Sequence, residues 1–361
     1  MRRVHLLMGI AALLMANQAK ALNEYIAWST YESFYASGYL PRVAIDQVYG
    51  AVNISESGTG FQNVFYETGN NQKGATPPGL SWTLWNADNK INGEVGHAAA
   101  IALASAGGYD TAIEVHQGGQ NGGAALWYDM ATAKLSSTLQ LPGSLKWSAG
   151  QQYDNGFNPT IAVDDSSVIT GTGAGIELVV EAHQATANLS DLWYHVGWLE
   201  SPGTSSPTFV WGPSNQYDSG YAPSISISDG LVVEAHQGTG GDLWYRLGTA
   251  AFFTITWSPA VKYDSGYNPS VSISGCISCG GWSIVEAHQS TTGTGPLMYR
   301  IGTVKSSSDT TIAWTPNSDT DYATGCYPSV AQNGAYVVEV HATSCNQSSN
   351  LVYSFGYFYF N

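Results

Sequence analysis

The sequence predicts an all-β protein, a six-bladed β-propeller built from four-stranded antiparallel blades. Three observations lead to this prediction. A loosely repeated unit opens six times, at positions 41, 99, 159, 223, 269 and 328. Each unit holds four short segments in which apolar and polar residues alternate, as they do in half-buried strands. The last unit stops after its third segment, and the start of the chain carries a copy of the missing fourth.

Four-stranded units that recur every 40 to 60 residues or so are typical of propellers with about 4–8 blades. A β-sandwich seldom repeats in this way, and the rungs of a β-helix are shorter. Both of these folds therefore suit the sequence less well.

Residues 1–21 have the pattern of a secretory signal peptide. Arg2 and Arg3 precede an apolar run from Leu6 to Ala16, and Ala19-Lys20-Ala21 follows as a small-residue cleavage site. The apolar run is about half as long as a helix that spans a bilayer. We therefore expect a secreted, extracellular protein without a membrane span, in which residues 22–361 form a single propeller domain.

The first two strands of each unit can be placed from recurring phrases. The first strand is an apolar alternation such as Pro269-Ser270-Val271-Ser272-Ile273. The second carries Val-Glu-Ala-His-Gln at 180–184, 233–237 and 285–289, with variants at 113–117 and 338–342. The first unit has Asn53 and Ser55 where the others have this Glu and His.

The third strand carries one tyrosine in every unit, and the fourth carries one tryptophan. These residues are Tyr66, Tyr128, Tyr194, Tyr245, Tyr299 and Tyr353, and Trp28, Trp82, Trp147, Trp211, Trp257 and Trp314. Trp28 belongs to the segment at the start of the chain, Ile26-Ala27-Trp28-Ser29. We expect this segment to complete the last blade and close the ring, which removes exposed sheet edges.

Four cysteines in an exported protein predict disulfides. Cys276 and Cys279 fall in the hairpin between the first and second strands of one unit. Cys326 stands just before the first strand of the last unit, and Cys345 just after its second strand. Antiparallel pairing brings these last two positions together, so we expect Cys326–Cys345 and Cys276–Cys279.

Charge and composition exclude several functions. Charged residues make up 11% of the chain and aromatic residues 12%, the reverse of the balance found in disordered proteins. The formal net charge is −15. A nucleic acid or an anionic membrane would be repelled by such a surface. We therefore expect neither as a partner.

The Glu-x-His pairs recur in five units, and a spacing of two residues places both side chains on one face of a strand. The favoured interpretation is a polar network between blades, repeated around the ring. Metal binding and acid–base catalysis stay as alternatives, since a site repeated five times suits neither well. The tryptophan that recurs in every fourth strand is interpreted as packing between blades.

The corners of the units offer the groups that a sugar site needs. In an in–out–in–out blade, the hairpin between the second and third strands lies on the same face as the link to the next blade. Glutamines, tryptophans and Tyr-Asp pairs should therefore gather in clefts between blades, although Asp-x-Gly also suits a plain turn. The predicted ligand-binding residues are Gln117, Trp127, Tyr153, Asp154, His183, Gln184, Trp193, Tyr217, Asp218, His236, Gln237, Trp244, Tyr263, Asp264 and Gln289.

One further repeat position varies in charge. Arg246 and Arg300 follow the third-strand tyrosine of their units, and the same position holds Glu67, Asp129, His195 and Ser354 elsewhere. Such variation is typical of a surface position or of separately tuned sites.

The repeat resembles that of propeller lectins of the tectonin and fucose-lectin kind. The resemblance rests on Trp-Gly-Pro-Ser at 211–214, Leu-Val-Val-Glu-Ala at 231–235 and Gly-Thr-Gly-Gly-Asp-Leu-Trp-Tyr at 238–245. It implies non-catalytic glycan binding between blades, with cell-surface or extracellular-matrix glycans as partners. The Glu-x-His-Gln phrase has no counterpart in the sugar sites of that family. No cofactor is expected, but calcium stays open because Asp154, Asp218 and Asp264 offer carboxylate ligands.

Two other functions remain as alternatives. Six-bladed propellers also include sialidases and other glycosidases, whose catalysis needs a unique pair of carboxyl groups. The unrepeated candidates for such a site are Arg42, Glu67, Glu94 and His97. The sialidase box Ser-x-Asp-x-Gly-x-Thr-Trp is absent, so an enzyme is less favoured than a binding protein. The third function is a structural or adhesive scaffold that binds proteins.

Overall fold

The computed structural model describes most of the chain after the predicted signal peptide. The described residues are 25–28, 33–46, 50–58, 62–71, 80–82, 90–118, 123–136, 140–164, 175–188, 190–276, 279–315 and 319–359. The predicted signal peptide, residues 1–21, lies outside them. Apart from one turn of 3₁₀ helix, η1 (Thr239–Gly241), every described element is a β-strand. None of the described helical structure has the length and apolar character needed to cross a membrane.

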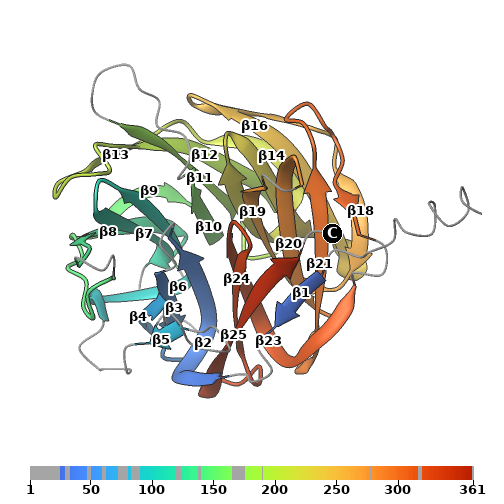
Figure 1. The fold of residues 1–361 in the computed structure, drawn as a ribbon, viewed down its shortest axis with the longest axis horizontal. Coiled ribbons are helices and arrows are strands. Elements are labelled where there is room, and N and C mark those ends of the chain that lie inside the picture. The colour runs from blue at the N-terminus through green and yellow to red at the C-terminus, as the bar shows by residue number, and fades with distance from the viewer. Residues whose placement is uncertain are drawn as a thin grey trace, which may run out of the picture.

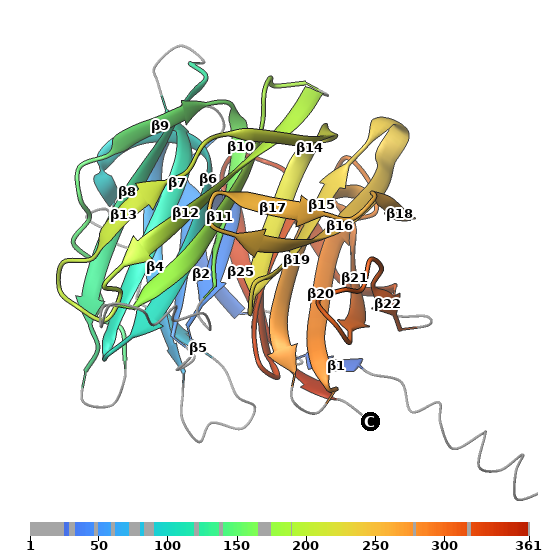
Figure 2. The same cartoon turned by 90° about the horizontal axis from the view of Figure 1, so that it is seen from above.

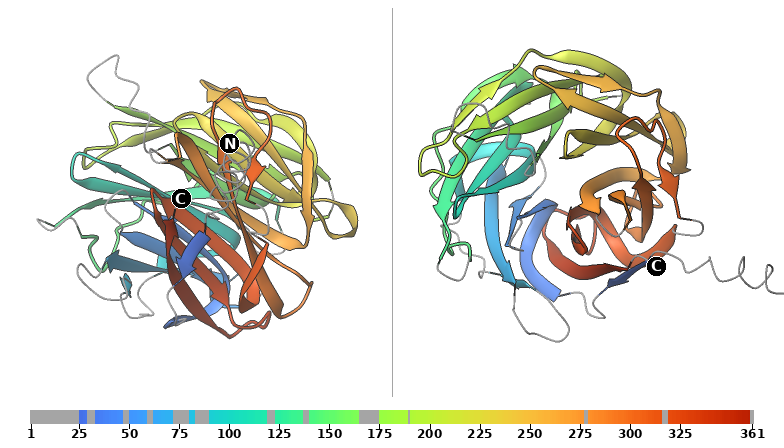
Figure 3. Two further views of the ribbon diagram at one scale, coloured as in Figure 1. Left: turned by 45° about the vertical axis from the view of Figure 1, so that its right-hand side comes forward. Right: turned by 45° about the horizontal axis from the view of Figure 1, so that its top comes forward.

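The strands form six blades around one axis, as the sequence predicts (Figure 3). Blades 1 to 6 are numbered in chain order by their innermost strands. These strands are β2 (Ser33–Ile45), β6 (Lys90–Ala106), β10 (Phe157–Val163), β14 (Asn215–Ser228), β19 (Tyr267–Cys276) and β23 (Thr320–Asn333). Each contacts the innermost strand of the next blade, and β23 contacts β2, so the ring is complete.

The middle of each blade consists of a second and a third strand. The second strands are β3 (Ala51–Glu56), β7 (Tyr109–Gly118), β11 (Ile176–Gln184), β15 (Leu231–Gln237), β20 (Gly281–Gln289) and β24 (Tyr336–Ala342). The third strands are β4 (Gln62–Asn71), β8 (Ala125–Lys134), β12 (Ser190–Glu200), β16 (Asp242–Ala251), β21 (Gly295–Val304) and β25 (Ser349–Tyr359).

The outermost strand of each blade comes in two pieces, a Trp segment and a segment that leads into the next blade. The Trp segments are β5 (Leu80–Trp82), β13 (Thr208–Trp211), β17 (Thr254–Trp257), β22 (Ala313–Trp314) and β1 (Tyr25–Trp28), with a single bridge from Trp147 to Ala131 in blade 2. The leading segments are β9 (Gln151–Asn155), β18 (Val261–Ser265) and the first parts of β2, β6, β14 and β23. Figure 2 shows β15, β16, β17 and β18 of blade 4 side by side.

One continuous strand thus belongs to two blades. Residues 215–220 of β14 pair with β12 of blade 3, and the residues from Tyr221 onward pair with β15 of blade 4. The second part has a β-bulge at its start, between Tyr221 and Ser224, and the residue there, Ala222, has a positive φ of 50°. The equivalent residue in every blade shares this conformation: Leu40, Ala98, Asn158, Ala222, Asn268 and Tyr327.

The N-terminal strand closes the ring, which confirms the prediction (Figure 1). β1 pairs with β25 of blade 6, with Trp28 opposite Gly356. The first part of β2 then pairs with the other half of β25 before the chain enters blade 1. Backbone hydrogen bonds between the two ends of the chain therefore complete the last sheet.

The six tryptophans pack between blades, as interpreted from their recurrence. Each lies directly opposite a small residue of its own third strand: Gly356, Gly69, Ala131, Gly197, Gly248 or Gly302. The third-strand tyrosine of the preceding blade meets each indole edge-on, as Tyr194 meets Trp257 at a centroid distance of 5.7 Å. The other pairs are Tyr299–Trp28, Tyr353–Trp82, Tyr66–Trp147, Tyr128–Trp211 and Tyr245–Trp314.

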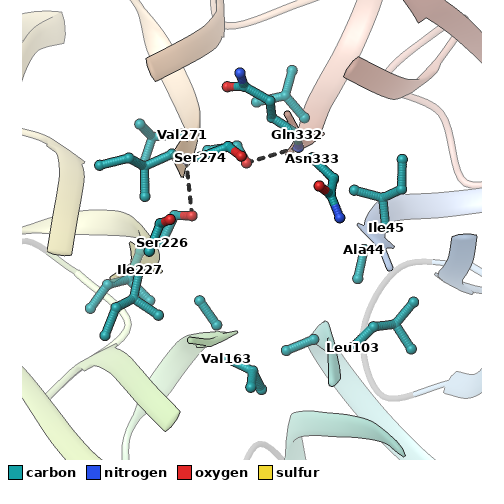
Figure 4. A pocket seen from close by; sticks show the side chains of 18 of the residues that line it. Ala44, Ile45, Leu103, Val163, Ser226, Ile227, Val271, Ser274, Gln332 and Asn333 are labelled. Carbon is teal, nitrogen blue, oxygen red and sulfur yellow. Dashed lines mark hydrogen bonds between the residues drawn. The ribbon is translucent and has the colours of Figure 1, made fainter. Parts of the chain in front are cut away.

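A central channel runs between the innermost strands and holds a cavity of about 240 Å³. Figure 4 shows Ser226, Ser274 and Gln332 on one side of this cavity, and Ala44, Leu103 and Val163 on the other. The serines join neighbouring strands, since a hydroxyl of one strand accepts a hydrogen bond from a backbone N–H of the next. These bonds run from Val271, Ile273 and Gly275 to Ser224, Ser226 and Ser228, and from Val330, Gln332 and Gly334 to Ser270, Ser272 and Ser274.

Both predicted disulfides are present. Cys276–Cys279 closes the hairpin between β19 and β20, with the two Cα atoms 5.4 Å apart. Cys326–Cys345 joins the start of the inner part of β23 to the turn after β24, with a Cα–Cα distance of 5.3 Å.

Candidate ligand sites between the blades

The predicted Asp and His side chains meet where consecutive blades pack against each other, and the predicted Trp side chains share that side of the sheet. We name each such region by its blades, so that junction 2/3 lies between blades 2 and 3. Alternate residues of a strand face opposite sides, and the His of a second strand shares its side with the Trp opposite it, as His183 does with Trp193. Junctions 2/3, 3/4 and 4/5 each contain an Asp from the leading segment of the earlier blade: Asp154, Asp218 and Asp264.

Each of these junctions contains a buried series of hydrogen bonds from a tyrosine to a glutamate and from that glutamate to a histidine. The hydroxyl of Tyr153 donates to Glu181 of the next blade over 3.0 Å, and Glu181 also contacts Nδ1 of His183 at 3.1 Å. The same series recurs as Tyr217–Glu234–His236, Tyr263–Glu286–His288 and Tyr322–Glu339–His341. Glu114 and His116 form the same pair in blade 2. The predicted polar network between blades is therefore present. Its glutamates bind Nδ1 of each histidine and so set the orientation of the imidazole ring.

The glycine of Tyr-Asp-x-Gly is needed for packing between blades as well as for the turn. A Cβ on Gly220 would lie 2.6 Å from Cδ2 of His236, and one on Gly156 would lie 2.4 Å from Cδ2 of His183. Real Cβ atoms do not come so close to a ring carbon. The imidazole of the next blade therefore packs directly on the backbone of the corner, where a side chain would prevent it.

Each of these aspartates binds a basic residue of the next blade. That residue directly follows the third-strand tyrosine, the repeat position whose charge varies between units. Oδ2 of Asp154 lies 2.7 Å from Nε2 of His195, and Oδ2 of Asp218 accepts from Nε of Arg246 at 2.5 Å. Asp264 makes the same ion pair with Arg300. Two units have alanine in place of this aspartate, and the residue after the third-strand tyrosine of the next blade is then not basic. Ala323 is matched with Ser354, and Ala36 with Glu67.

These three basic partners were not in the predicted set, although their position was noted for its variable charge. The signal that identifies them is the match between two repeat positions: an aspartate at the corner accompanies a His or Arg after the third-strand tyrosine. The pattern at either position by itself does not reveal the ion pair. The pairing appears when the corner of one unit is compared with the third strand of the following unit, because the next blade packs against that corner.

The charges of junction 2/3 are strongly perturbed. Burial by itself would raise the pKa of Asp154, but hydrogen bonds from His195, from the Asn155 N–H and from Ser214 outweigh it and lower the pKa to about 2. Burial opposes protonation of His195, yet the hydrogen bond to Asp154 and the charge of Glu181 raise its pKa. Burial and Glu181 together raise the pKa of Tyr153 well above its usual value, so its hydroxyl stays a donor.

The predicted tryptophans and aspartates keep contact with solvent. Trp127, Trp193 and Trp244 are half-buried, and the equivalent residue in blade 5 is Met298, also half-buried. The side chains of Asp154, Asp218 and Asp264 are 25%, 17% and 15% exposed. A half-buried ring and a partly exposed carboxylate thus stand at two junctions, and a thioether replaces the ring at the third.

The predicted glutamines lie on the opposite face of their strands and are buried. Oε1 of Gln184 accepts from the backbone N–H of Ala222 in the next blade at 2.8 Å and from the amide of Asn158 at 2.6 Å. Its Nε2 donates to two carbonyls of its own hairpin, those of Thr186 and Asn188. Gln237 and Gln289 accept from Asn268 and Tyr327 in the same way, and Gln117 donates to Gly123. The amides of Gln184, Gln237 and Gln289 thus bind the backbone of the left-handed bulge residues in the following blade.

The catalytic candidates that the structure describes divide between the two faces of blade 1. Arg42 lines the mouth of the channel, and its charge interacts with Glu56. His97 lies at junction 1/2, where its Nδ1 is 3.0 Å from Oε2 of Glu56, a residue outside the predicted set. Glu67 lies on the other face of blade 1, where it accepts from Asn53 over 2.8 Å, and burial raises its pKa to about 7. Glu94 belongs to β6, but its side chain lies outside what the structure describes.

Three groups of side chains in the described residues could share a metal ion. Their ligand atoms lie within 4.8 Å of one another in each group: Asp154–His183–His195, Glu114–His116–Asp129 and Asp264–His288–Asp319. The third already contains Arg300, which binds Asp264 and lies 3.7 Å from Asp319.

No protein-family model and no curated protein sequence matches the chain. Its class is clear from the fold, which is that of the six-bladed propellers. It is similar to the fucose-specific lectin from Aleuria aurantia, with a TM-score of 0.54 and 11% identity over 88% of this chain and 97% of the lectin. A second structure of that lectin, described as a six-bladed propeller, gives 0.53 and 12% over 86% and 90%.

The fold is also similar to that of an enzyme. The sialidase from Trypanosoma rangeli, in complex with sialic acid, matches with a TM-score of 0.51 and 12% identity over 92% of this chain. The match covers 58% of the sialidase, so this chain spans little more than half of that protein's length. At these identities the comparisons establish the propeller fold that lectins and sialidases share.

Proposed function

We propose that the protein is an exported carbohydrate-binding propeller whose glycan sites lie at junctions 2/3, 3/4 and 4/5. The observation that carries this proposal is a repeated pair: a partly exposed aspartate locked to a basic side chain. A carboxylate accepts hydrogen bonds from sugar hydroxyls, and a guanidinium or imidazolium donates to them. The half-buried rings of Trp193 and Trp244, beside two of these pairs, offer a face on which the C–H groups of a pyranose can stack.

The arrangement supports binding rather than hydrolysis. Most glycosidases use two carboxyl groups about 5 to 9.5 Å apart in one unique place. Among the described candidates, Arg42 and His97 both interact with one carboxylate, Glu56, whereas Glu67 lies on the other face of blade 1. Three equivalent sites around one ring suit a multivalent surface, because several weak contacts to cell-surface or matrix glycans add up to high avidity.

Export is part of the proposal. It is supported by the predicted signal peptide and by the two disulfides, which are typical of oxidising compartments.

A glycan array probed with residues 22–361 tests the function. We expect saturable binding to a defined set of glycans, weakened at least tenfold in a Trp193→Ala/Trp244→Ala double variant. The matched control is Trp198→Ala, since Trp198 is also half-buried on β12 but lies toward the far end of that strand, against Phe252 and Phe253. Thermal unfolding of all variants verifies that the fold is retained.

Two results would contradict the proposal. One is an array to which the folded protein binds no glycan. The other is equal loss of binding in Trp198→Ala and in the double variant. Release of reducing sugar from any glycan would instead identify a hydrolase, and would direct attention to blade 1.

A further inference from the structure

We propose that junction 2/3 is a metal site, in which Nε2 of His183, Nε2 of His195 and Oδ2 of Asp154 bind one divalent transition-metal ion, with Zn²⁺ the ion that suits it. The three atoms lie within 4.8 Å of one another. Oδ2 of Asp154 is 2.7 Å from Nε2 of His195 and 3.7 Å from Nε2 of His183.

Both imidazoles are held with Nε2 directed toward Asp154. Nδ1 of His183 is 3.1 Å from the carboxylate of Glu181, and Nδ1 of His195 is 2.9 Å from the carbonyl oxygen of Gly212. Carboxylate and carbonyl oxygens are acceptors, so Nδ1 of each ring carries the proton. When a metal ion displaces the proton that His195 shares with Asp154, the lone pair of each ring is on Nε2, which faces that carboxylate. Outer partners of this kind orient histidine ligands in known metal sites.

The spacing and burial fit a small ion. Zn²⁺ with bonds of 2.0–2.1 Å in a tetrahedron separates its ligand atoms by about 3.3 Å. The two separations from Asp154 lie on either side of this value, and the two imidazole nitrogens lie within 4.8 Å of each other, so small shifts of these side chains would bring the three atoms to tetrahedral spacing. The side chains of His183 and His195 are 2% and 5% exposed, whereas that of Asp154 is 25% exposed. The fourth ligand position then opens toward solvent.

The donor set selects the class of ion. Two imidazole nitrogens and one carboxylate oxygen suit zinc and its first-row neighbours, while calcium takes six to eight oxygen ligands. The calcium left open by the sequence is thus not the ion that this junction fits.

Junctions 3/4 and 4/5 provide an internal comparison. They have the same aspartate and histidine, Asp218 with His236 and Asp264 with His288, but Arg246 and Arg300 occupy the place of His195. Each arginine holds its aspartate with a fixed positive charge and has no lone pair to offer. Among these three junctions, the ion therefore belongs to junction 2/3. The remaining group, Glu114–His116–Asp129, is fully buried, so we expect one accessible site and one ion per chain.

This inference concerns one of the proposed glycan sites, but its test measures the ion alone, so either can fail without the other. Calorimetric titration of the tag-free protein with Zn²⁺ at neutral pH should give one site per chain. The same titration with Co²⁺ should produce the visible bands of a tetrahedral complex. His195→Arg, which copies the other two junctions, should weaken Zn²⁺ binding at least about 100-fold, since loss of a ligand costs more than loss of an outer partner.

Two more variants secure the result. His195→Gln removes the ligand without adding charge, and it replaces His195→Arg if that variant does not fold. Arg246→His recreates the arrangement of junction 2/3 at junction 3/4, so it should add a second equivalent of bound Zn²⁺. Equal affinity in the wild type and in the folded His195 variants, or a wild type that binds no Zn²⁺, would overturn the proposal.

Discussion

The hydroxyl of Tyr217 donates a 2.9 Å hydrogen bond to Oε1 of Glu234 across the boundary between blades 3 and 4. Glu234 is fully buried, and its carboxylate also contacts Nδ1 of His236 at 3.0 Å. The ring of Tyr217 stacks on Trp257 of the same following blade, with centroids 5.1 Å apart. One tyrosine thus couples two sheets by a polar and an aromatic contact.

Tyr217→Phe should lower the free energy of unfolding by about 1–3 kcal/mol, because a buried carboxylate loses one of its donors while the stacked ring remains. Urea denaturation followed by fluorescence measures this change. The control is Tyr359→Phe, since Tyr359 is 43% exposed. Equal stability of Tyr217→Phe and the wild type would show that the bond between blades contributes nothing.

Gly220→Ala should destabilise the protein by roughly 1–3 kcal/mol through overpacking. The new methyl group would lie 2.6 Å from Cδ2 of His236 and 2.9 Å from the carbonyl oxygen of Gln237. Gly293→Ala is the matched control, because a Cβ there has nothing within 4 Å. Thermal unfolding of the two variants should separate them clearly; a Gly220→Ala midpoint no lower than that of Gly293→Ala would refute the close contact.

Stability should decrease as the pH rises above about 6.5. Burial alone would lower the pKa of His236 and of His288, but Glu234 and Glu286 outweigh it and raise both. A histidine whose pKa is raised by folding stabilises the protein below its unfolded pKa of about 6.5, and that contribution is lost as the pH passes the folded pKa. Denaturation curves across this pH range measure the slope.

Glu67 adds to the same trend at lower pH. Its burial raises the pKa to about 7, so the folded state favours the protonated carboxyl. This costs stability progressively as the pH rises from about 4.3 to about 7. Glu67→Gln can still accept the bond from Asn53, and it should be more stable than the wild type at pH 8 by roughly 3 kcal/mol. A wild type that becomes more stable with rising pH would contradict both expectations.

Removal of Cys326–Cys345 should cost about 3 kcal/mol, since the bond spans 19 residues and restricts the unfolded chain. Cys276–Cys279 spans 3 residues, and its removal should cost about half as much. Alanine double variants of each pair, compared by urea denaturation under non-reducing conditions, test this order. The reverse order would mean that effects in the folded state outweigh the loop entropy.

The repeat by itself determined the architecture of this protein. The recurring Tyr and Trp of the third and fourth strands, the six openings and the orphan copy around Trp28 were enough to predict six blades closed by the N-terminal strand. Each of these signals is local, because alternation and turn residues specify a strand within a few positions. The disulfides followed from the same register.

The composition of the site depended on contacts between units. Whether Gln184 or Trp193 faces a given junction depends on which side of the sheet each residue takes, and on which blade packs there. The pairing of Asp154 with His195 joins residues 41 positions apart in different blades. The packing of His236 on Gly220 and the left-handed backbone at Ala222 arise from the approach of one blade to the next. Such features depend on how whole sheets pack, so only the tertiary structure decided them.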